Sequence, residues 1–119
     1  MRRPPDLATL RAAWWAYRSL RRARRTLRTT GFEELTLADP PELPPSAARG
    51  VRHVLRREPS TCLERALVLQ RWHAAHGRPL DVIVGVAGSG PAFRAHAWLE
   101  NESGTEATMP FTELRRVKP

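Results

Sequence analysis

Cys62 is the single cysteine of this 119-residue chain, and its position suggests a nucleophile. A thiol attacks a carbonyl carbon as the thiolate, and the unpaired backbone N–H groups at the start of a helix favour that anion. Here Pro59 precedes two residues that can cap a helix, Ser60 and Thr61, and the cysteine follows directly. We therefore predict that Cys62 begins a helix whose N–H groups can also hold an oxyanion. The alternative is a buried cysteine that only fills space.

His96 is the candidate general base. In a strand over residues 93–100, successive side chains alternate between the two faces. One face then carries Phe93, Ala95, Ala97 and Leu99, and the other carries Arg94, His96, Trp98 and Glu100. The flanking alanines leave room for another element to approach the imidazole. The other histidines, His53, His73 and His76, are expected on helix surfaces, and no Cys/His cluster has the spacing of a zinc site, so we expect neither a metal nor a cofactor.

Three helices are expected before the strands. The first covers residues 7–27, with arginines on one side and an inward stripe on the other, made of Leu7, Leu10, Trp14, Tyr17, Leu20 and Leu27. The second covers residues 47–57, is capped by Ser46 and turns Ala48, Val51 and Leu55 inward. The third covers residues 62–76, and its apolar residues spread over more than half of its circumference, which predicts a helix packed on several sides.

The remaining chain reads as strands. Residues 81–87 form an apolar run, residues 93–100 alternate, and a turn at 102–105 leads into a short third strand ending near residue 109. Helices followed by an antiparallel meander predict the α+β class. We divide the single domain into an Arg-rich amphipathic helix (1–38) that serves as a docking element, a Pro-rich connector (39–45) and a Cys-His core (46–119).

The positive charge of the chain is concentrated near its N-terminus. Residues 1–30 contain nine arginines and one acid, so they account for the whole net charge of +8. Such a segment can meet nucleic acid, an anionic membrane surface, or an acidic protein or peptide. We do not expect nucleic acid, because nothing in the sequence supplies base readout. The candidate contacts are Arg18, Arg21, Arg22 and Arg25.

The expected location is the cytoplasm, without a membrane span. No apolar run reaches the roughly 20 residues that cross a bilayer. The N-terminus has no continuous apolar stretch of the kind found in secretory signals. A single cysteine forms no internal disulfide, which fits a reducing compartment.

Three segments together resemble the leader-peptidase (B protein) family of lasso-peptide biosynthesis, within the transglutaminase-like, papain-type superfamily. They are Thr-Cys-Leu-Glu-Arg-Ala-Leu (61–67), Gly-Val (85–86) and His-Ala-Trp-Leu-Glu (96–100). The resemblance covers about residues 46–116 and, more weakly, the first helix. It implies a papain/transglutaminase-like core with Cys62 as nucleophile and His96 as base.

The resemblance also implies a pathway and partners. A Cys-His-Asp hydrolase of this family cuts the leader from a ribosomally made precursor peptide, and a separate ATP-dependent lasso cyclase then closes the new N-terminus onto an acidic side chain. This chain is too short to include the leader-recognition domain found in longer members. It is therefore similar to the stand-alone peptidase, which works with a separate recognition protein. The arginine-rich helix would dock that protein or the leader.

One position departs from the family pattern. The family's third catalytic residue is an aspartate on the strand after the histidine strand, and this chain has no aspartate after Asp81. Glu106 is the nearest carboxylate, and Thr108 lies closest to the expected position. Glu106 can orient the imidazole if its longer side chain reaches; a Cys-His dyad is the alternative. Amide transfer on the same acyl-enzyme and a non-catalytic scaffold also stay open.

Overall fold

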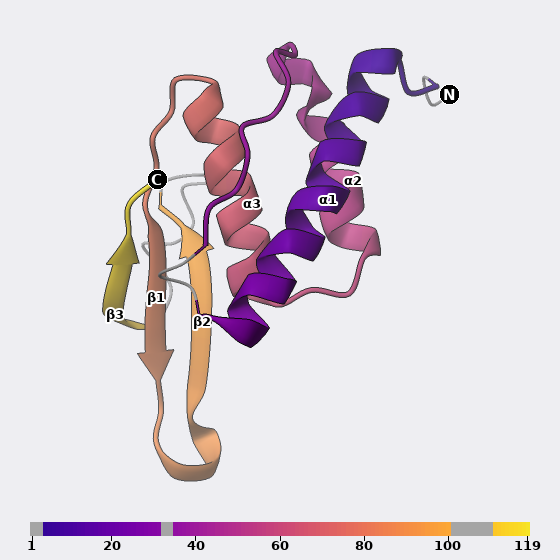
Figure 1. Ribbon diagram of the computed structural model, residues 1–119. Coiled ribbons are helices and arrows are strands. Elements are labelled where there is room, and N and C mark those ends of the chain that lie inside the picture. The colour runs from indigo at the N-terminus through magenta and orange to yellow at the C-terminus, as the bar shows by residue number, and fades with distance from the viewer. Residues whose placement is uncertain (1–3, 32–34, 101–110) are drawn as a thin grey trace. The chain divides into compact units, whose positions relative to one another are not determined.

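The computed structural model describes residues 4–31, 35–100 and 111–119 (Figure 1). The chain divides into two compact units, Met1–Ser60 and Thr61–Pro119, and each is described by itself. Within these ranges the first unit contains two α-helices and a short 3-10 helix, and the second contains one α-helix, a short 3-10 helix and three strands. Of the helices in the described ranges, none combines the length and the apolar content needed to span a membrane.

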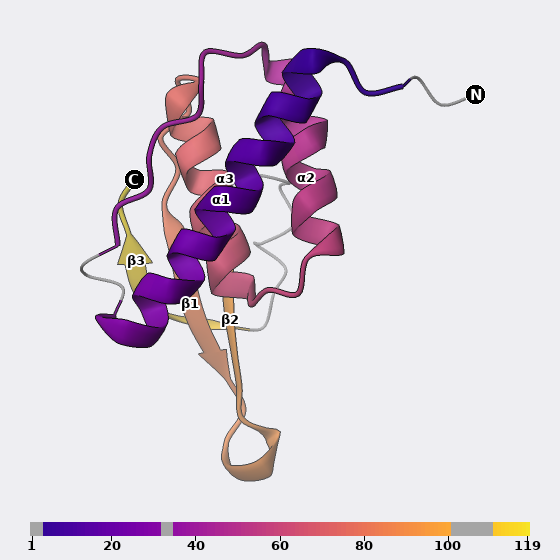
Figure 2. The same cartoon turned by 45° about the vertical axis from the view of Figure 1, so that its right-hand side comes forward.

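In the first unit, α1 (Leu7–Thr29) lies against α2 (Ala48–Arg57), as Figure 2 shows. The side chain of Asp6 caps α1 by accepting a 2.8 Å hydrogen bond from the backbone N–H of Thr9. The predicted Ser46 cap of α2 is wrong. A short 3-10 helix, Pro45–Ala47, leads into α2 and places Ser46 inside a helical turn, so the helix starts without a side-chain cap.

The predicted inward stripe of α1 is wrong in its N-terminal half, whereas Leu20 is buried as predicted. Leu7, Leu10 and Trp14 are 72%, 53% and 61% exposed. The buried face consists mostly of small residues: Thr9, Ala12, Trp15, Ala16, Ser19, Leu20 and Ala23. The reason is the close approach of α2, because a Cβ atom added to Gly50 would lie 2.2 Å from the carbonyl oxygen of Thr9. At that separation small side chains fit between the helices and large ones do not.

The second unit joins α3 (Cys62–Ala75) to an antiparallel sheet of β1 (Val82–Ala87), β2 (Arg94–Leu99) and β3 (Thr112–Val117). These elements confirm the predicted α+β class. The strand order is β2-β1-β3, so β1 lies between the other two and β2 does not occupy the middle as a simple meander would require. The strand predicted to end near residue 109 falls outside the described residues, and β3 pairs with β1 instead.

The core of the second unit combines α3 with the first two strands. Its buried apolar residues are Ala66, Leu67, Val68, Trp72, Val82, Ile83, Ala97 and Leu99. The amide of Gln70 donates hydrogen bonds to the carbonyls of Leu80 (3.0 Å) and Val117 (2.7 Å), which ties the helix to the sheet. His73 is buried on this helix, so its predicted surface position is wrong. Because polar residues are buried along with the apolar ones, α3 is packed on several sides, as predicted.

Candidate active site

The N-terminus of α3 is held by a reciprocal capping box. The Thr61 side chain accepts a hydrogen bond from the Glu64 N–H (3.1 Å), and the Glu64 carboxylate accepts one from the Thr61 N–H (3.0 Å). Two of the otherwise unpaired N–H groups of the first turn are thereby satisfied. Cys62 is the first residue of the helix, which confirms the predicted start.

The sulfur of Cys62 lies against the backbone of β2. Its Sγ atom accepts a hydrogen bond from the Ala97 N–H at 3.3 Å, and the side chain is partly buried. Ala97 directly follows His96, so the sulfur meets β2 at the residue next to the predicted base. Among the described residues, no hydrogen bond joins Sγ to the His96 ring itself. The sulfur thus lies at the N-terminus of α3 with one backbone N–H group directed at it.

The imidazole of His96 belongs to an aromatic cluster, which we define as His96, Trp98 and Phe111. The His96 ring stacks on Trp98 with a centroid distance of 5.7 Å and an interplanar angle of 18°, and it lies 5.5 Å from the Phe111 ring. Strand alternation predicted the shared face of His96 and Trp98, and the stacking confirms it. Phe111 was missed, because only the chain's path into β3 brings it to His96.

Gly85 makes room for this aromatic cluster. It pairs with His96 across the β1–β2 ladder, and a Cβ atom added to it would lie 2.8 Å from Cη2 of Trp98 and 3.0 Å from Cβ of Phe111. A side chain at this position would therefore displace the rings that surround the imidazole. The Nε1–H group of Trp98 is buried without a hydrogen-bond partner in the described part of the chain, which is uncommon in folded proteins.

A network of ion pairs connects the ends of the strands. Asp81 accepts hydrogen bonds from Lys118 Nζ (2.9 Å) and Arg116 Nη1 (3.3 Å). Arg116 also bonds to Glu113 and to Glu100, each at 2.8 Å. The Lys118 ammonium, and then the Arg116 guanidinium, hold the pKa of the Asp81 carboxyl below its usual value. Glu113 and Glu100 raise the pKa of Arg116 in return. The last aspartate of the sequence is thus engaged in holding the strands together.

The candidates for the third catalytic residue, Glu106 and Thr108, lie outside the described residues. Their roles stay predictions, as does the orientation of the imidazole by either of them.

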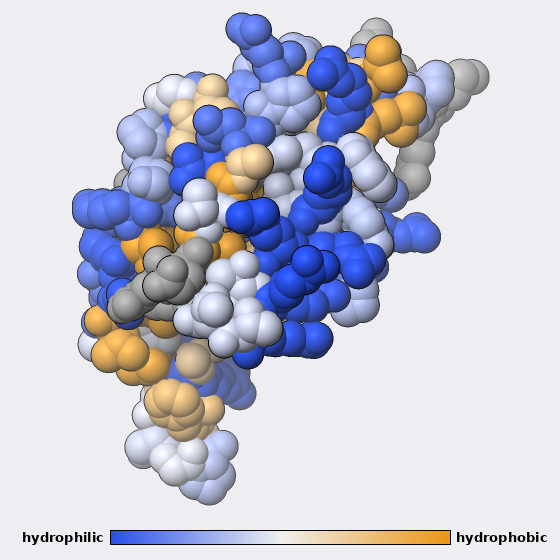
Figure 3. All heavy atoms as spheres, in the orientation of Figure 1, coloured by the Kyte–Doolittle hydropathy of each residue, from blue (hydrophilic) through white to orange (hydrophobic). Residues whose placement is uncertain are grey.

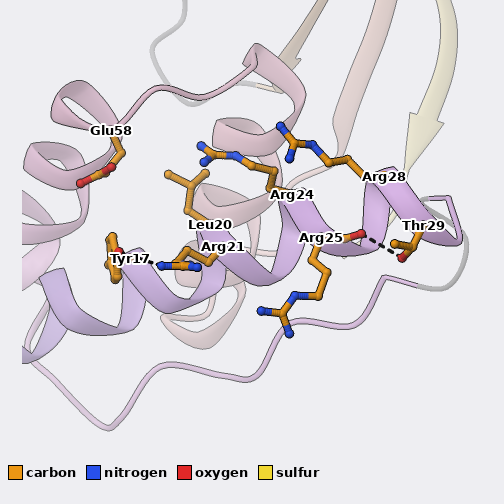
Figure 4. A pocket seen from close by; sticks show the side chains of 8 residues that line it. All are labelled: Tyr17, Leu20, Arg21, Arg24, Arg25, Arg28, Thr29 and Glu58. Atoms are coloured by element: carbon orange, nitrogen blue, oxygen red, sulfur yellow. Dashed lines mark hydrogen bonds between the residues drawn. The ribbon is translucent and has the colours of Figure 1, made fainter.

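The four arginines predicted to bind a partner all line one groove on α1. This groove has a volume of about 850 Å³, and Arg18, Arg21, Arg22 and Arg25 contribute to it. A smaller cavity of about 320 Å³ lies beside it, where Arg24 and Arg28 join Arg21 and Arg25 opposite Glu58 (Figure 4). Arg21 Nη1 donates to the Tyr17 hydroxyl at 3.1 Å, within the same cavity.

Comparison with known proteins identifies a family for the chain that contains Cys62 and His96. A family model described as the transglutaminase-like superfamily matches residues 6–116. The chain belongs to the transglutaminase-like superfamily. No curated protein and no solved structure matches it. The superfamily includes cysteine peptidases and commonly carries Cys-His-Asp chemistry, so membership confirms the broader part of the resemblance found in the sequence.

Proposed function

We propose that this transglutaminase-like protein is a cysteine peptidase that removes the leader from a ribosomally made precursor peptide in lasso-peptide maturation. The observation that carries the proposal is the placement of Cys62. Its sulfur lies at the first residue of a capped helix and accepts a hydrogen bond from the backbone next to His96. Acyl transfer uses a nucleophile at a helix N-terminus and a base on an adjoining strand, and Cys62 and His96 supply these two groups.

In the proposed reaction, His96 takes the proton from Cys62 and the thiolate attacks the scissile carbonyl carbon. A C–S bond forms, and N–H groups at the start of α3 bind the oxyanion. The C–N bond then breaks as the imidazolium gives its proton to the departing amine, which becomes the N-terminus of the core peptide. Water, deprotonated by His96, hydrolyses the thioester and releases the leader.

Proton transfer requires an imidazole nitrogen within hydrogen-bond reach of the sulfur. Catalytic contacts are often long in a free enzyme and shorten when substrate binds. The stacking of His96 on Trp98, and its tilted contact with Phe111, support a role for these rings in setting the orientation of the imidazole. Glu106 is our first choice for the orienting carboxylate, with Thr108 or a bare dyad as the alternatives.

The proposed partners follow from the same function. They are the precursor with its leader, a separate leader-recognition protein, and a lasso cyclase that acts on the product. If an amine replaces water at the acyl-enzyme, the same site performs amide transfer. Product mass separates the two reactions, because hydrolysis adds water and transfer adds the amine.

The test begins with a search of the neighbouring genes for a small precursor peptide and a recognition protein. Cleavage of that precursor is then followed by mass spectrometry in the presence of the recognition protein. We expect cleavage by the wild-type chain and a loss of at least about 1,000-fold in Cys62→Ala and His96→Ala. Ser60→Ala, which removes a hydroxyl two residues before the cysteine, is the matched control and should cleave normally. Cleavage at the same bond by Cys62→Ala would exclude this cysteine as the nucleophile.

The identity of the third catalytic residue is tested by separate substitutions. Glu106→Gln should lower the cleavage rate strongly if a carboxylate orients His96, whereas Thr108→Ala should do so if the hydroxyl does. An unchanged rate in both variants would favour the dyad. If the wild-type chain cleaves nothing and its thiol is inert toward a mild electrophile, the scaffold alternative replaces the peptidase.

A further inference from the structure

The outer face of α1 carries large side chains that the first unit does not bury. Leu7, Leu10 and Trp14 are all more than half exposed. Arg11, Arg18 and Arg25 recur every seven residues, which places them on one side of a helix with 3.6 residues per turn. All three are exposed. Figure 3 shows hydrophilic side chains gathered over much of α1 and hydrophobic ones near its N-terminal end.

The segment after α1 turns this face into a groove. Residues 35–41 run back along the helix, held by hydrogen bonds from Trp15 Nε1 to the Ala38 carbonyl (3.0 Å) and from Arg22 Nε to the Thr36 carbonyl (2.8 Å). We call the resulting space of about 850 Å³ the α1 groove. Its lining comprises Leu10, Arg11, Trp14, Trp15, Arg18, Ser19, Arg21, Arg22, Arg25, Ala38, Asp39 and Pro41.

The α1 groove combines apolar side chains with Arg11 toward its N-terminal end and is mainly basic toward its C-terminal end. Leu10 and Trp14 lie toward the N-terminus of the helix, and the Trp14 ring stacks on Tyr17 with centroids 6.0 Å apart. Arg18, Arg22 and Arg25 lie toward the C-terminus. At 1.5 Å per residue the distance from Leu10 to Arg25 is about 22 Å, the length of six or seven residues of extended peptide.

Positive charge exceeds negative charge in this groove within the described part of the chain. Arg11, Arg18 and Arg25 form no ion pair with any carboxylate there. Asp39 is the one acid in the lining, against five arginines. A ligand with carboxylates at the basic end would therefore be attracted both at long range and in contact.

We infer that the α1 groove is a docking site for an acidic, amphipathic polypeptide segment. The segment would be six or seven residues long, with apolar side chains over Leu10 and Trp14 and at least two carboxylates over Arg18 and Arg25. A polypeptide fits better than nucleic acid, because the exposed Leu10 and Trp14 side chains favour an apolar partner, which peptide side chains supply and a sugar-phosphate backbone does not. It fits better than a membrane, because a bilayer surface cannot follow a walled groove.

This inference goes beyond the proposed peptidase and does not depend on it. The measurement is therefore made with the full chain carrying Cys62→Ala, in which no bound peptide would be cleaved. If no peptide binds the α1 groove, the result of the cleavage experiment is unaffected. If the wild-type chain cleaves no precursor, the measured peptide binding is still valid.

The experiment selects random peptides of about 12 residues, displayed on a surface, after depletion on the Arg18→Glu/Arg25→Glu variant. The tightest peptide is synthesised with a fluorophore and titrated by anisotropy. We expect peptides that combine carboxylates with apolar residues. Their affinity should fall about tenfold or more in Arg18→Glu/Arg25→Glu and in Leu10→Ser/Trp14→Ser.

The matched control is Arg56→Glu/Arg57→Glu, which makes the same charge change on exposed arginines of α2. Binding to this control should stay within about twofold of the parent. A peptide with lysine in place of its carboxylates should recover affinity for Arg18→Glu/Arg25→Glu. Circular dichroism of each variant separates loss of binding from loss of fold.

Three outcomes would overturn the inference. The first is the absence of any peptide that distinguishes the parent from the groove variants. The second is enrichment of peptides without carboxylates. The third is binding of a random duplex DNA, or of phosphatidylglycerol vesicles, that is tighter than any peptide and is lost in the same variants. That result would assign the groove to nucleic acid or to a lipid surface.

Discussion

Each unit of this protein contains a glycine pressed against a neighbouring element, but the two glycines meet different kinds of atoms. In the first unit, Gly50 faces the backbone of α1, whose Thr9 carbonyl oxygen lies where a Cβ atom would be. In the second unit, Gly85 faces the side chains of Trp98 and Phe111. Backbone in a helix cannot move without moving the helix, whereas side chains can rotate. The comparison indicates that Gly50 sets the separation of two helices and Gly85 sets the positions of rings around His96.

The largest effect is expected for Gly50→Ala. The added methyl group would lie 2.2 Å from the Thr9 oxygen, so α1 and α2 must separate. We expect a loss of about 3 kcal/mol in the free energy of unfolding, measured by urea denaturation. Alanine gains about 1 kcal/mol of helix propensity over glycine, so a net stabilisation would show that the helices are not closely packed. Arg56→Ala, on the exposed side of α2, is the control and should change little.

Gly85→Ala should give a smaller loss of stability but a larger loss of cleavage. The added Cβ atom would lie 2.8 Å from Cη2 of Trp98, at the outer end of a side chain that can rotate away, so we expect about 1–2 kcal/mol of destabilisation. That rotation would disturb the stacking on His96 and lower the rate of precursor cleavage. Leu114→Ala, whose side chain is 69% exposed on β3, should leave the rate nearly unchanged. If Gly85→Ala cleaved at the wild-type rate, the aromatic cluster would have no part in positioning the imidazole.

The two units can also be compared through the caps of their helices, Asp6 on α1 and Thr61 on α3. Thr61→Ala and Asp6→Ala each remove a side chain that accepts from a first-turn N–H group, and each should cost about 1 kcal/mol in thermal or urea unfolding. Only Thr61→Ala should also lower cleavage, because α3 presents Cys62 and α1 does not. Thr61→Ser keeps the hydroxyl and should restore both properties. Equal cleavage by the two alanine variants would separate the capping box from the reaction.

The smallest expected effect concerns acid sensitivity. Lys118 and Arg116 depress the pKa of Asp81, so its carboxylate stabilises the folded state above its unfolded pKa, near pH 4. That contribution should disappear as the pH falls through the lower, folded-state pKa. Urea midpoints between about pH 6 and pH 2.5 should fall less steeply for Asp81→Asn than for the wild type.

Asp6 provides the counterpart in the first unit. Its pKa is also lowered, by the hydrogen bonding of Thr9, and its contribution should vanish in the same pH window. In Asp6→Asn the urea midpoint should therefore also fall less steeply with falling pH, independently of the Asp81 substitution.

If the urea midpoint of Asp81→Asn fell with pH as steeply as that of the wild type, the ion-pair network would not contribute to stability.

Local features of the sequence predicted much of this molecule. The bounds of α1, α2 and α3 were predicted to within two residues, because capping residues and apolar periodicity act over a few positions. The start of α3 at Cys62 and the shared face of His96 and Trp98 follow from the same short-range rules. The roles of Cys62 and His96 in catalysis stay predictions.

The errors have a common cause in contacts between distant residues. The prediction that Leu10 and Trp14 lie on the buried face of α1 was wrong. It relied on large apolar side chains being buried, whereas the close approach of Gly50 selects small residues. The strand order, and with it the place of Phe111 beside His96, depends on β3 pairing with β1. Neither the contact of Gly50 with α1 nor the pairing of β3 with β1 leaves a periodic signal in a single sequence.

The hydrogen bond from Ala97 to sulfur has a practical consequence. Because β2 lies at one end of the order formed by the described strands, the amide proton of Ala97 is protected by a side chain rather than by a neighbouring strand. Its exchange with deuterated solvent therefore depends on the state of the thiol. Alkylating or oxidising Cys62 would change that acceptor, and the exchange rate at this single amide would follow the chemistry of the sulfur without any substrate present.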